Sequence, residues 1–302
     1  MSSKIEFVDD EDHKFSSFNL VGKKNVSKQT MRLKRPLLKS YDDDVYARSS
    51  QKDVLVVSSK NITKIKIGDT YAMEWALPNY GDYPTLAVGN DRAVTIASIG
   101  SSLRTVRFQP KFLRPCVCIS WNRKKESIIA AGFKRAKDYC LQIWDAKRSG
   151  GSTSQYTPIS PGIGDRATRT TSNHSAYTIH PIQKLCKTEE CASTEWLSSS
   201  PMCLAVGLES GVVRVYDLQV RGRSNVIREF RAHEKDHVVR AVASKDHMLA
   251  TFSDDGTVKI WDIRKIMQKK TEFECISSLF YSSTSSRTIT QISWIDNHHL
   301  GT

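Results

Sequence analysis

Residues 251–265 read Thr-Phe-Ser-Asp-Asp-Gly-Thr-Val-Lys-Ile-Trp-Asp-Ile-Arg-Lys, a pattern that predicts a strand, a tight turn and a second strand. The stretch from Met248 to Ser253 favours a first strand. Asp255-Gly256 is a hairpin turn pair, because glycine tolerates the positive φ that such turns need. The alternating stretch from Thr257 to Ile263 predicts the second strand. We therefore expect a β-hairpin that ends on a Trp-Asp pair.

Weaker copies of this hairpin recur along the chain. The Trp-Asp pair has counterparts at Ile143-Trp144-Asp145 and Val215-Tyr216-Asp217. A small-residue strand end lies upstream of each pair, at Ala130-Ala131-Gly132, Ala205-Val206-Gly207 and Ala250-Thr251-Phe252, and Ala87-Val88-Gly89 is an earlier member of that series. A second series consists of Trp75, Trp121, Trp196 and Trp294. Both series advance by about 45 residues where no insertion intervenes, which is the period of WD-repeat β-propeller blades.

The repeat predicts an all-β chain, a WD-repeat β-propeller with about five blades plus a partial one. We expect degenerate first strands and a basic arm in residues 1–50, and an incomplete propeller over residues 51–302. After a first pair of strands at 53–67, the predicted blades lie near 71–100, 114–147, 193–220 and 226–265, and a last one begins at 276. A Ser/Thr/Gly-rich insertion at about 148–192 is expected to lie between blades. Because a propeller has to close, we expect the 302 residues to be an incomplete fragment of a seven-bladed ring, or a truncated gene model.

Composition favours a reduced intracellular compartment. No apolar run approaches the ~18 residues of a membrane span, and the acidic stretch from Glu6 to Asp12 is unlike a signal peptide. The seven cysteines are odd in number and irregularly spaced, which favours free thiols over disulfides. Cys116-Val-Cys118 and Cys186…Cys191 lack the C-x2-C spacing of a zinc site. We expect no metal and no other cofactor.

The net charge of +13 is the strongest compositional bias. Part of it is concentrated in one segment: Lys23, Lys24, Lys28, Arg32, Lys34, Arg35 and Lys39. Such a segment could contact nucleic acid, an anionic membrane or an acidic partner. Because no aromatic side chains are interleaved to stack on bases, a solvated arm is the preferred interpretation.

The repeat residues themselves are predicted to stabilise the blades. His233 or His237 is placed to join Ser253, Asp255 and Trp261 in a hydrogen-bonded tetrad, in which the serine links the histidine and aspartate to the indole. The corresponding signature residues are Asp262, Trp144, Asp145, Tyr216 and Asp217. A catalytic His-Asp-Ser interpretation lacks a nucleophile elbow. Phosphate-loop and His-Glu-x-x-His motifs are absent, and no pair of carboxylates stands out, so the sequence does not predict an enzyme.

Three further stretches carry a family resemblance. Arg114-Pro-Cys-Val-Cys-Ile-Ser-Trp-Asn122, Ile129-Ala-Ala-Gly132 and Asp138-Tyr-Cys-Leu-Gln-Ile-Trp-Asp145 together resemble the third repeat of the Mio ("missing oocyte") family. The spacer Phe133-Lys-Arg-Ala-Lys137 is also similar. The order of repeats agrees over about residues 53–302, whereas the basic arm, the insertion and the missing C-terminal part depart from the family. Family members are much longer, with a helical solenoid and a zinc-binding end.

The resemblance implies a non-catalytic scaffold subunit of a GATOR/SEA-type complex that promotes amino-acid signalling to TOR complex 1. It also implies a cytoplasmic location at the lysosomal or vacuolar surface, with indirect membrane contact and no small-molecule substrate. The implied partners are other propeller-bearing subunits, Sec13-like and Seh1-like, although the sequence does not locate the partner-binding surface. Two alternatives stay open: a nuclear or RNA-associated WD scaffold that uses its basic charge, and a lipid-binding propeller. The nearest string to the Phe-Arg-Arg-Gly motif of lipid-binding propellers is Val220-Arg-Gly-Arg-Ser224, which lacks it.

Overall fold

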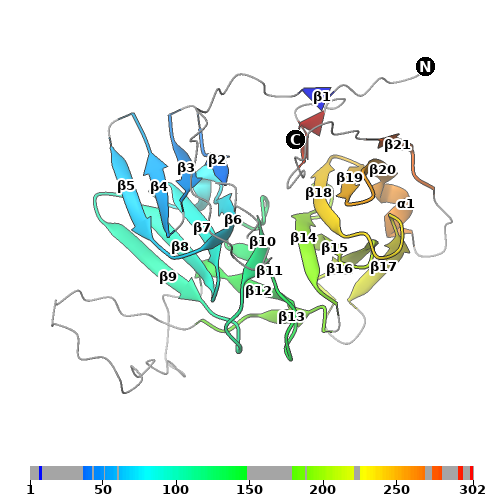
Figure 1. Ribbon diagram of the computed structural model, residues 1–302, viewed down its shortest axis with the longest axis horizontal. Coiled ribbons are helices and arrows are strands. Elements are labelled where there is room, and N and C mark those ends of the chain that lie inside the picture. The colour runs from blue at the N-terminus through cyan, green and yellow to red at the C-terminus, as the bar shows by residue number, and fades with distance from the viewer. Residues whose placement is uncertain are drawn as a thin grey trace, which may run out of the picture.

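Consecutive strands of the chain pair with one another in five four-stranded antiparallel sheets (Figure 1). The computed structural model describes residues 7–8, 37–42, 44–50, 52–59, 61–147, 179–187, 189–220, 225–268, 274–280, 292–294 and 300–301, and the structural statements below concern these residues. Each sheet follows the chain from its first strand to its fourth, as the predicted blades of a propeller should. The fold prediction of a partial WD-repeat propeller is confirmed.

The first three sheets contain strands β2 to β13. The first sheet is formed by β2 (Leu38–Ser40), β3 (Tyr46–Ser49), β4 (Asp53–Val57) and β5 (Ile62–Lys66). The second sheet is formed by β6 (Thr70–Trp75), β7 (Thr85–Asn90), β8 (Val94–Ile99) and β9 (Leu103–Phe108), with the short 3-10 helix η1 (Pro78–Tyr80) after β6. The third sheet is formed by β10 (Cys116–Trp121), β11 (Ile128–Phe133), β12 (Leu141–Asp145) and β13 (Gln183–Leu185).

Two further complete sheets and a partial one follow. The fourth sheet is formed by β14 (Cys191–Trp196), β15 (Cys203–Leu208), β16 (Val212–Asp217) and β17 (Val226–Arg231). The fifth is formed by β18 (Val239–Lys245), β19 (Met248–Ser253), β20 (Thr257–Asp262) and β21 (Ser277–Phe280), with helix α1 (Ile263–Met267) after β20. The partial sheet pairs β22 (Ser293–Trp294) with β23 (Leu300–Gly301), and β23 with β1 (Phe7–Val8) from the N-terminus. β1 runs parallel to β23, so the two ends of the chain meet in one sheet (Figure 1).

The domain boundaries expected from the sequence need three corrections. Residues 226–265 do not form one blade, because β17 is the outer strand of the fourth sheet and the fifth begins at Val239. The insertion does not lie between blades, because β13 pairs with β12 and completes the third sheet. Residues 148–178 lie outside the described residues and join two strands of one blade. Most of the basic arm, up to residue 36, also lies outside them, and the first sheet crosses the boundary expected at residue 50.

Hydrophobic cores lie between neighbouring sheets, one core at each junction. In β11, Ile129 and Ala131 face the second sheet, whereas Ile128 and Ala130 face the fourth. Successive residues of a strand point to opposite faces, so a sheet that is covered on both sides needs a continuous apolar run. All six residues of β11 are buried, and the same holds for β7 and β15. This explains the small, apolar Ala-Ala-Gly and Ala-Val-Gly strand ends of the repeat.

The glycine that ends these runs makes room for the next sheet. A Cβ atom on Gly207 would lie 2.7 Å from Cγ1 of Val239, the first residue of β18. A Cβ atom on Gly89 would similarly lie 2.7 Å from Sγ of Cys116 at the start of β10. The residue opposite each glycine follows a β-bulge in the inner strand, at Ser193 and Ala72 respectively. Close approach of two sheets, and not a turn, therefore explains glycine here.

Substitution of Gly207 is expected to separate the fourth and fifth sheets. We predict that Gly207→Ala lowers the free energy of unfolding by about 1–3 kcal/mol, because overpacking forces neighbouring atoms to shift. The matched control is Gly81→Ala, whose added Cβ would meet no atom within 4 Å and whose effect should stay within about 0.5 kcal/mol. Urea denaturation of both variants measures the difference, and equal midpoints would contradict this account of the glycine.

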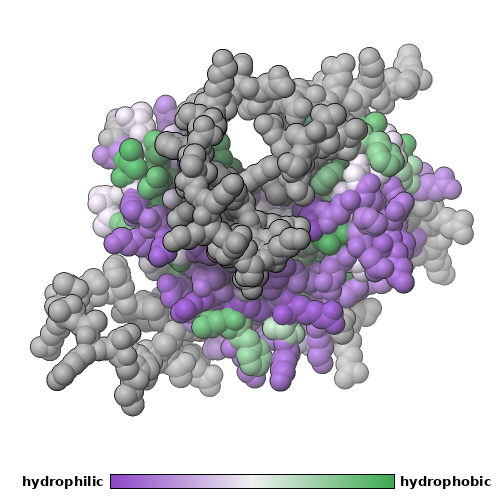
Figure 2. Space-filling view, viewed as in Figure 1, coloured by the Kyte–Doolittle hydropathy of each residue, from purple (hydrophilic) through white to green (hydrophobic). Residues whose placement is uncertain are grey.

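No helix among the described residues is long and apolar enough to cross a membrane. Hydrophilic side chains cover much of the described surface on the face shown in Figure 2, and hydrophobic residues appear there as separate patches. The larger exposed apolar side chains include Ile62, Leu113 and Phe280.

Candidate functional site

A chain of hydrogen bonds among buried side chains joins His233, through Thr251, to Trp261 in strand β20. His233 Nδ1 lies 3.0 Å from Oδ2 of Asp255, and His233 Nε2 lies 2.8 Å from Oγ1 of Thr251. Trp261 Nε1 donates to the same Thr251 Oγ1 at 3.0 Å. One consistent set of donors satisfies the chain: the indole donates to Thr251, the Thr251 hydroxyl to Nε2, and Nδ1–H to the Asp255 carboxylate.

This arrangement corrects the predicted tetrad at one position. Thr251, and not Ser253, links the histidine to the indole, and the buried Ser253 Oγ has no hydrogen-bond partner among the described residues. The reason is strand register: Trp261 pairs with Leu249, which places Thr251, two residues further along β19, beside the indole nitrogen. His237 is not in the network, and its Nδ1 lies 3.1 Å from the carbonyl oxygen of Lys235.

The titration behaviour of the network agrees with this hydrogen-bond assignment. Burial lowers the pKa of His233, although the neighbouring Asp255 carboxylate acts to raise it. The lowered pKa favours the neutral imidazole. Burial acts to raise the pKa of Asp255, but hydrogen bonds from the side chain and backbone of Thr257 and from the backbone N–H of Glu234 help to outweigh it, so the pKa is lowered. A neutral histidine with both ring nitrogens engaged fits a structural linkage.

Three aspartates that end the third strands of their sheets, β12, β16 and β20, share one local geometry. Oδ1 of Asp145 accepts from the backbone N–H of Lys147 at 3.0 Å, and Oδ1 of Asp217 accepts from that of Gln219 at 2.9 Å. Oδ1 of Asp262 accepts from the N–H of Arg264 at 2.9 Å, which caps helix α1. Each aspartate therefore fixes the chain where it leaves the blade.

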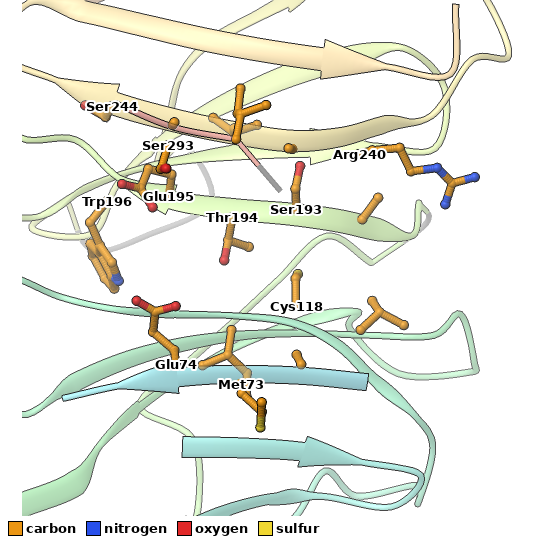
Figure 3. A pocket seen from close by; sticks show the side chains of 18 of the residues that line it. Met73, Glu74, Cys118, Ser193, Thr194, Glu195, Trp196, Arg240, Ser244 and Ser293 are labelled. Atoms are coloured by element: carbon orange, nitrogen blue, oxygen red, sulfur yellow. The ribbon is translucent and has the colours of Figure 1, made fainter. Parts of the chain in front are cut away.

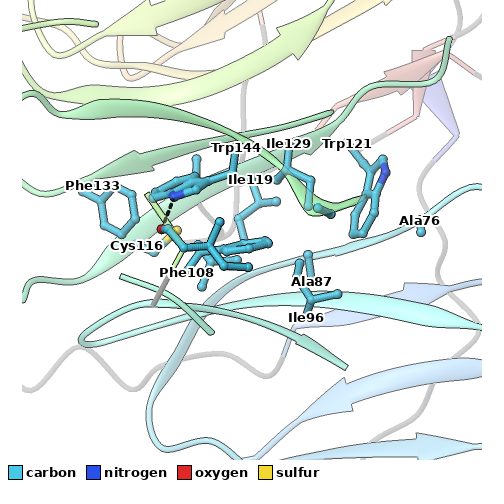
Figure 4. Close-up of a cluster of buried hydrophobic side chains, with 14 residues drawn as sticks. Ala76, Ala87, Ile96, Phe108, Cys116, Ile119, Trp121, Ile129, Phe133 and Trp144 are labelled. Carbon is cyan, nitrogen blue, oxygen red and sulfur yellow. Dashed lines mark hydrogen bonds between the residues drawn. The ribbon is translucent and has the colours of Figure 1, made fainter. Parts of the chain in front are cut away.

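The aromatic residues that precede these aspartates differ in their partners. Trp144 is fully buried and donates from Nε1 to the carbonyl oxygen of Ile179 at 3.1 Å. Its ring stacks on Phe108 and meets the edge of Phe133, as Figure 4 shows. The hydroxyl of Tyr216 lies 3.1 Å from the Sγ atom of Cys186. The structure therefore gives each signature residue its own contacts, and among the described residues it assembles the His-Asp-Trp network only in the fifth blade.

Three members of the second tryptophan series link the inner strands of adjacent blades, whereas Trp121 Nε1 donates to the carbonyl oxygen of Glu126 within its own blade. Trp75 Nε1 donates to the Lys39 carbonyl oxygen in β2 at 3.0 Å, and Trp196 Nε1 donates to the Ser120 carbonyl oxygen in β10 at 3.0 Å. Trp294 Nε1 donates to the carbonyl oxygen of Ala243 in β18 at 3.3 Å. In each of these three cases the acceptor belongs to the preceding sheet. The sequence showed the spacing of this series but not that it connects blades.

The inner strands surround a central channel of about 910 Å³. Residues of β6, β10, β14 and β18 line it, together with β22 and residues of β2. Figure 3 shows the side chains of Glu74 and Glu195 in this channel, with Trp196 beside them. Lys39 pairs with Glu74 at 3.0 Å. Sequence analysis missed this pair of carboxylates, and the repeated Glu-Trp dipeptide at 74–75 and 195–196 is the signal that could have revealed it.

Burial in the channel raises the pKa of Glu195 to about 7, with Glu74 adding to the shift and Arg123 opposing it. The native state then holds a proton that the unfolded state has released, because the ordinary pKa of the carboxyl is 4.5. We predict that stability falls as the pH rises from about 4.5 to about 7, and that Glu195→Gln flattens this dependence. Urea denaturation at a series of pH values measures it. The exposed Glu234→Gln is the control, and an unchanged slope in Glu195→Gln would contradict the prediction.

Comparison with known proteins identifies the family of this chain. The family model described as "MIOS, WD40 repeat" matches residues 57–294. The chain belongs to this family. The match runs from the end of β4 through β22.

Curated relatives agree with this assignment. The chain is 25% identical over 248 residues to the GATOR2 complex protein MIOS of Dictyostelium discoideum, covering 74% of this chain and 21% of the relative. It is 28% identical over 202 residues to the GATOR2 complex protein MIOS-A of Xenopus laevis, covering 62% and 21%. The chain thus spans about a fifth of the length of these relatives. A chain in a crystal structure of the mitotic checkpoint complex is similar in fold alone, with a TM-score of 0.55, 16% identity, and coverage of 95% of this chain and 79% of that chain.

Proposed function

We propose that this chain is the propeller part of a non-catalytic scaffold subunit of a GATOR2-type complex, which promotes amino-acid signalling to TOR complex 1. The observation that carries the proposal is the family match over residues 57–294, together with relatives that are named as GATOR2 complex proteins. A cytoplasmic position at the lysosomal or vacuolar surface belongs to the same proposal.

The architecture supports a scaffold role on physical grounds. Every junction between successive described sheets is filled by a hydrophobic core, and the tryptophan linkages fix neighbouring inner strands to one another. Rigid blades of this kind hold surface loops in fixed relative positions, which suits contacts with several proteins at once.

The chemistry of the fifth blade also supports a non-catalytic role. Both ring nitrogens of His233 are engaged, and the histidine is 2% exposed. A general base has to reach the proton that it removes. His233 cannot do so without breaking the network that joins it to Asp255 and Thr251.

The proposal is tested by purifying the full-length protein, tagged at its natural expression level, from its own cells. We expect Sec13-like and Seh1-like propeller proteins to co-purify, and removal of the gene to reduce phosphorylation of TOR complex 1 substrates after amino acids are restored. The matched control is the same protein without residues 1–302, which separates contacts of the propeller from those of the remaining chain. Recovery of the full-length protein without propeller-bearing partners would exclude the proposed assembly.

A further inference from the structure

We propose that Cys118 and Cys191 are an oxidisable dithiol that closes to a disulfide between the third and fourth blades. Their Sγ atoms lie 3.7 Å apart, although the two residues are 73 positions apart in the chain. Cys118 belongs to β10 and Cys191 to β14, the inner strands of adjacent sheets. Both thiols are free in the structure.

The two sulfur atoms share a space that Gly132 leaves open. A Cβ atom on Gly132 would lie 2.9 Å from Sγ of Cys191 and would overlap Sγ of Cys118. The thiols are thus in van der Waals contact with no side chain between them. A disulfide requires the sulfur atoms to approach from 3.7 Å to about 2.05 Å, and no intervening side chain has to be displaced.

The same junction recurs between other blades, but with other side chains. Between the second and third sheets, Gly89 lies opposite Ala72 and against Cys116. Between the fourth and fifth sheets, Gly207 lies opposite Ser193 and against Val239. The fold therefore tolerates alanine or serine opposite the glycine, where Cys118 lies at the junction of the third and fourth sheets. It also tolerates valine packed against the glycine, where Cys191 lies at that junction. Only the junction of the third and fourth sheets places two sulfur atoms there, among the junctions that the structure describes.

Access for an oxidant comes from the central channel. Cys118 is half-buried and lines the channel, where Figure 3 shows it near Ser193. Cys191 is fully buried, and burial together with its hydrogen bond to Cys118 raises its pKa well above the ordinary value. Cys118 is therefore the residue that an oxidant reaches first, and Cys191 is the thiol that resolves the product.

With hydrogen peroxide as the oxidant, the steps balance. Cys118 loses its proton and its sulfur attacks one peroxide oxygen, so that the O–O bond breaks and the departing hydroxide takes up a proton to leave as water. The Cys191 sulfur then attacks the sulfenic sulfur of Cys118, the S–S bond forms, and the hydroxyl leaves with the Cys191 proton as a second water. The two thiols lose two electrons and the peroxide is reduced to two water molecules.

Neither a metal site nor another thiol accounts for the pair. Among the described residues, no group of three or more His, Cys, Asp or Glu side chains could hold a metal ion. Cys186 already interacts with the Tyr216 hydroxyl.

The test is peroxide treatment of the folded 302-residue chain, followed by unfolding, alkylation of free thiols and peptide mapping by mass spectrometry. We expect Cys118 and Cys191 to resist alkylation and to appear as one linked peptide pair, lighter by two hydrogen atoms. Fragmentation assigns the linkage, because tryptic peptides carry Cys116 with Cys118 and Cys191 with Cys203. A linkage through Cys116 or Cys203, or oxidation of Cys118 to sulfinic acid while Cys191 stays alkylatable, would overturn the proposal.

The chain itself supplies conservative variants. Cys118→Ser and Cys191→Val copy the residues at the next junction and should fold, yet each should abolish the linkage. Cys203→Ser, a matched control on the same tryptic peptide as Cys191, should retain it. Oxidation should raise the melting temperature of the wild-type chain and of Cys203→Ser but leave that of the first two variants unchanged. An equal rise in Cys118→Ser would also overturn the proposal.

Discussion

Trp144→Ala is expected to lower the free energy of unfolding by about 3–5 kcal/mol, the range for removing a large, fully buried aromatic side chain. Trp144 has no exposed surface and lies between Phe108 of the second sheet and Phe133 of its own. Its removal opens a cavity at the junction of two blades. It also leaves the carbonyl oxygen of Ile179 without the indole donor.

The loss of stability in Trp144→Ala should be largest near β13, in addition to the loss for the whole chain. The Trp144 indole binds Ile179, the first described residue after 148–178, and β13 begins four residues later. Hydrogen exchange of the backbone amides of Gln183–Leu185 should therefore accelerate in Trp144→Ala, beyond what the lower global stability explains. Phe112→Ala is the matched control, because Phe112 is 43% exposed and its loss should change stability by no more than about 0.5 kcal/mol. Comparable losses in the two variants would contradict the predicted role of Trp144.

The repeat made the fold predictable, because each blade carries its own strand signals. The small-residue strand ends predicted β7, β11, β15 and β19, and the Trp-Asp pairs predicted β12 and β20. Outer strands carry weaker signals, since only one of their neighbours is a strand of the same sheet. For this reason the sequence pattern places β17 in the wrong blade and β13 within the insertion.

The candidate site was less predictable, because its contacts depend on register and on neighbouring blades. Thr251 and Ser253 lie on the same side of one strand and both carry hydroxyl groups. The sequence pattern alone therefore does not show which of them links His233 to Trp261. The pairing of Leu249 with Trp261 decides between them. Likewise, the proximity of Cys118 to Cys191 and of Glu74 to Glu195 arises only when successive inner strands surround the channel.

Thr251→Val is expected to lower the free energy of unfolding by about 2–4 kcal/mol, although valine has nearly the same shape as threonine. The hydroxyl accepts from Trp261 Nε1 and contacts His233 Nε2, and both side chains are buried. Its removal leaves one donor and one acceptor without a partner, and each unsatisfied buried group costs about 1–3 kcal/mol.

Ser253→Ala is the matched control, two residues away on the same strand. Ser253 is also fully buried, but its Oγ makes no hydrogen bond among the described residues. Removal of a hydroxyl that has no partner should leave stability unchanged or slightly raised. Urea denaturation midpoints, compared at unchanged slope, measure both variants. A larger loss in Ser253→Ala than in Thr251→Val would restore serine as the linking residue, whereas the register of β19 and β20 requires the opposite order.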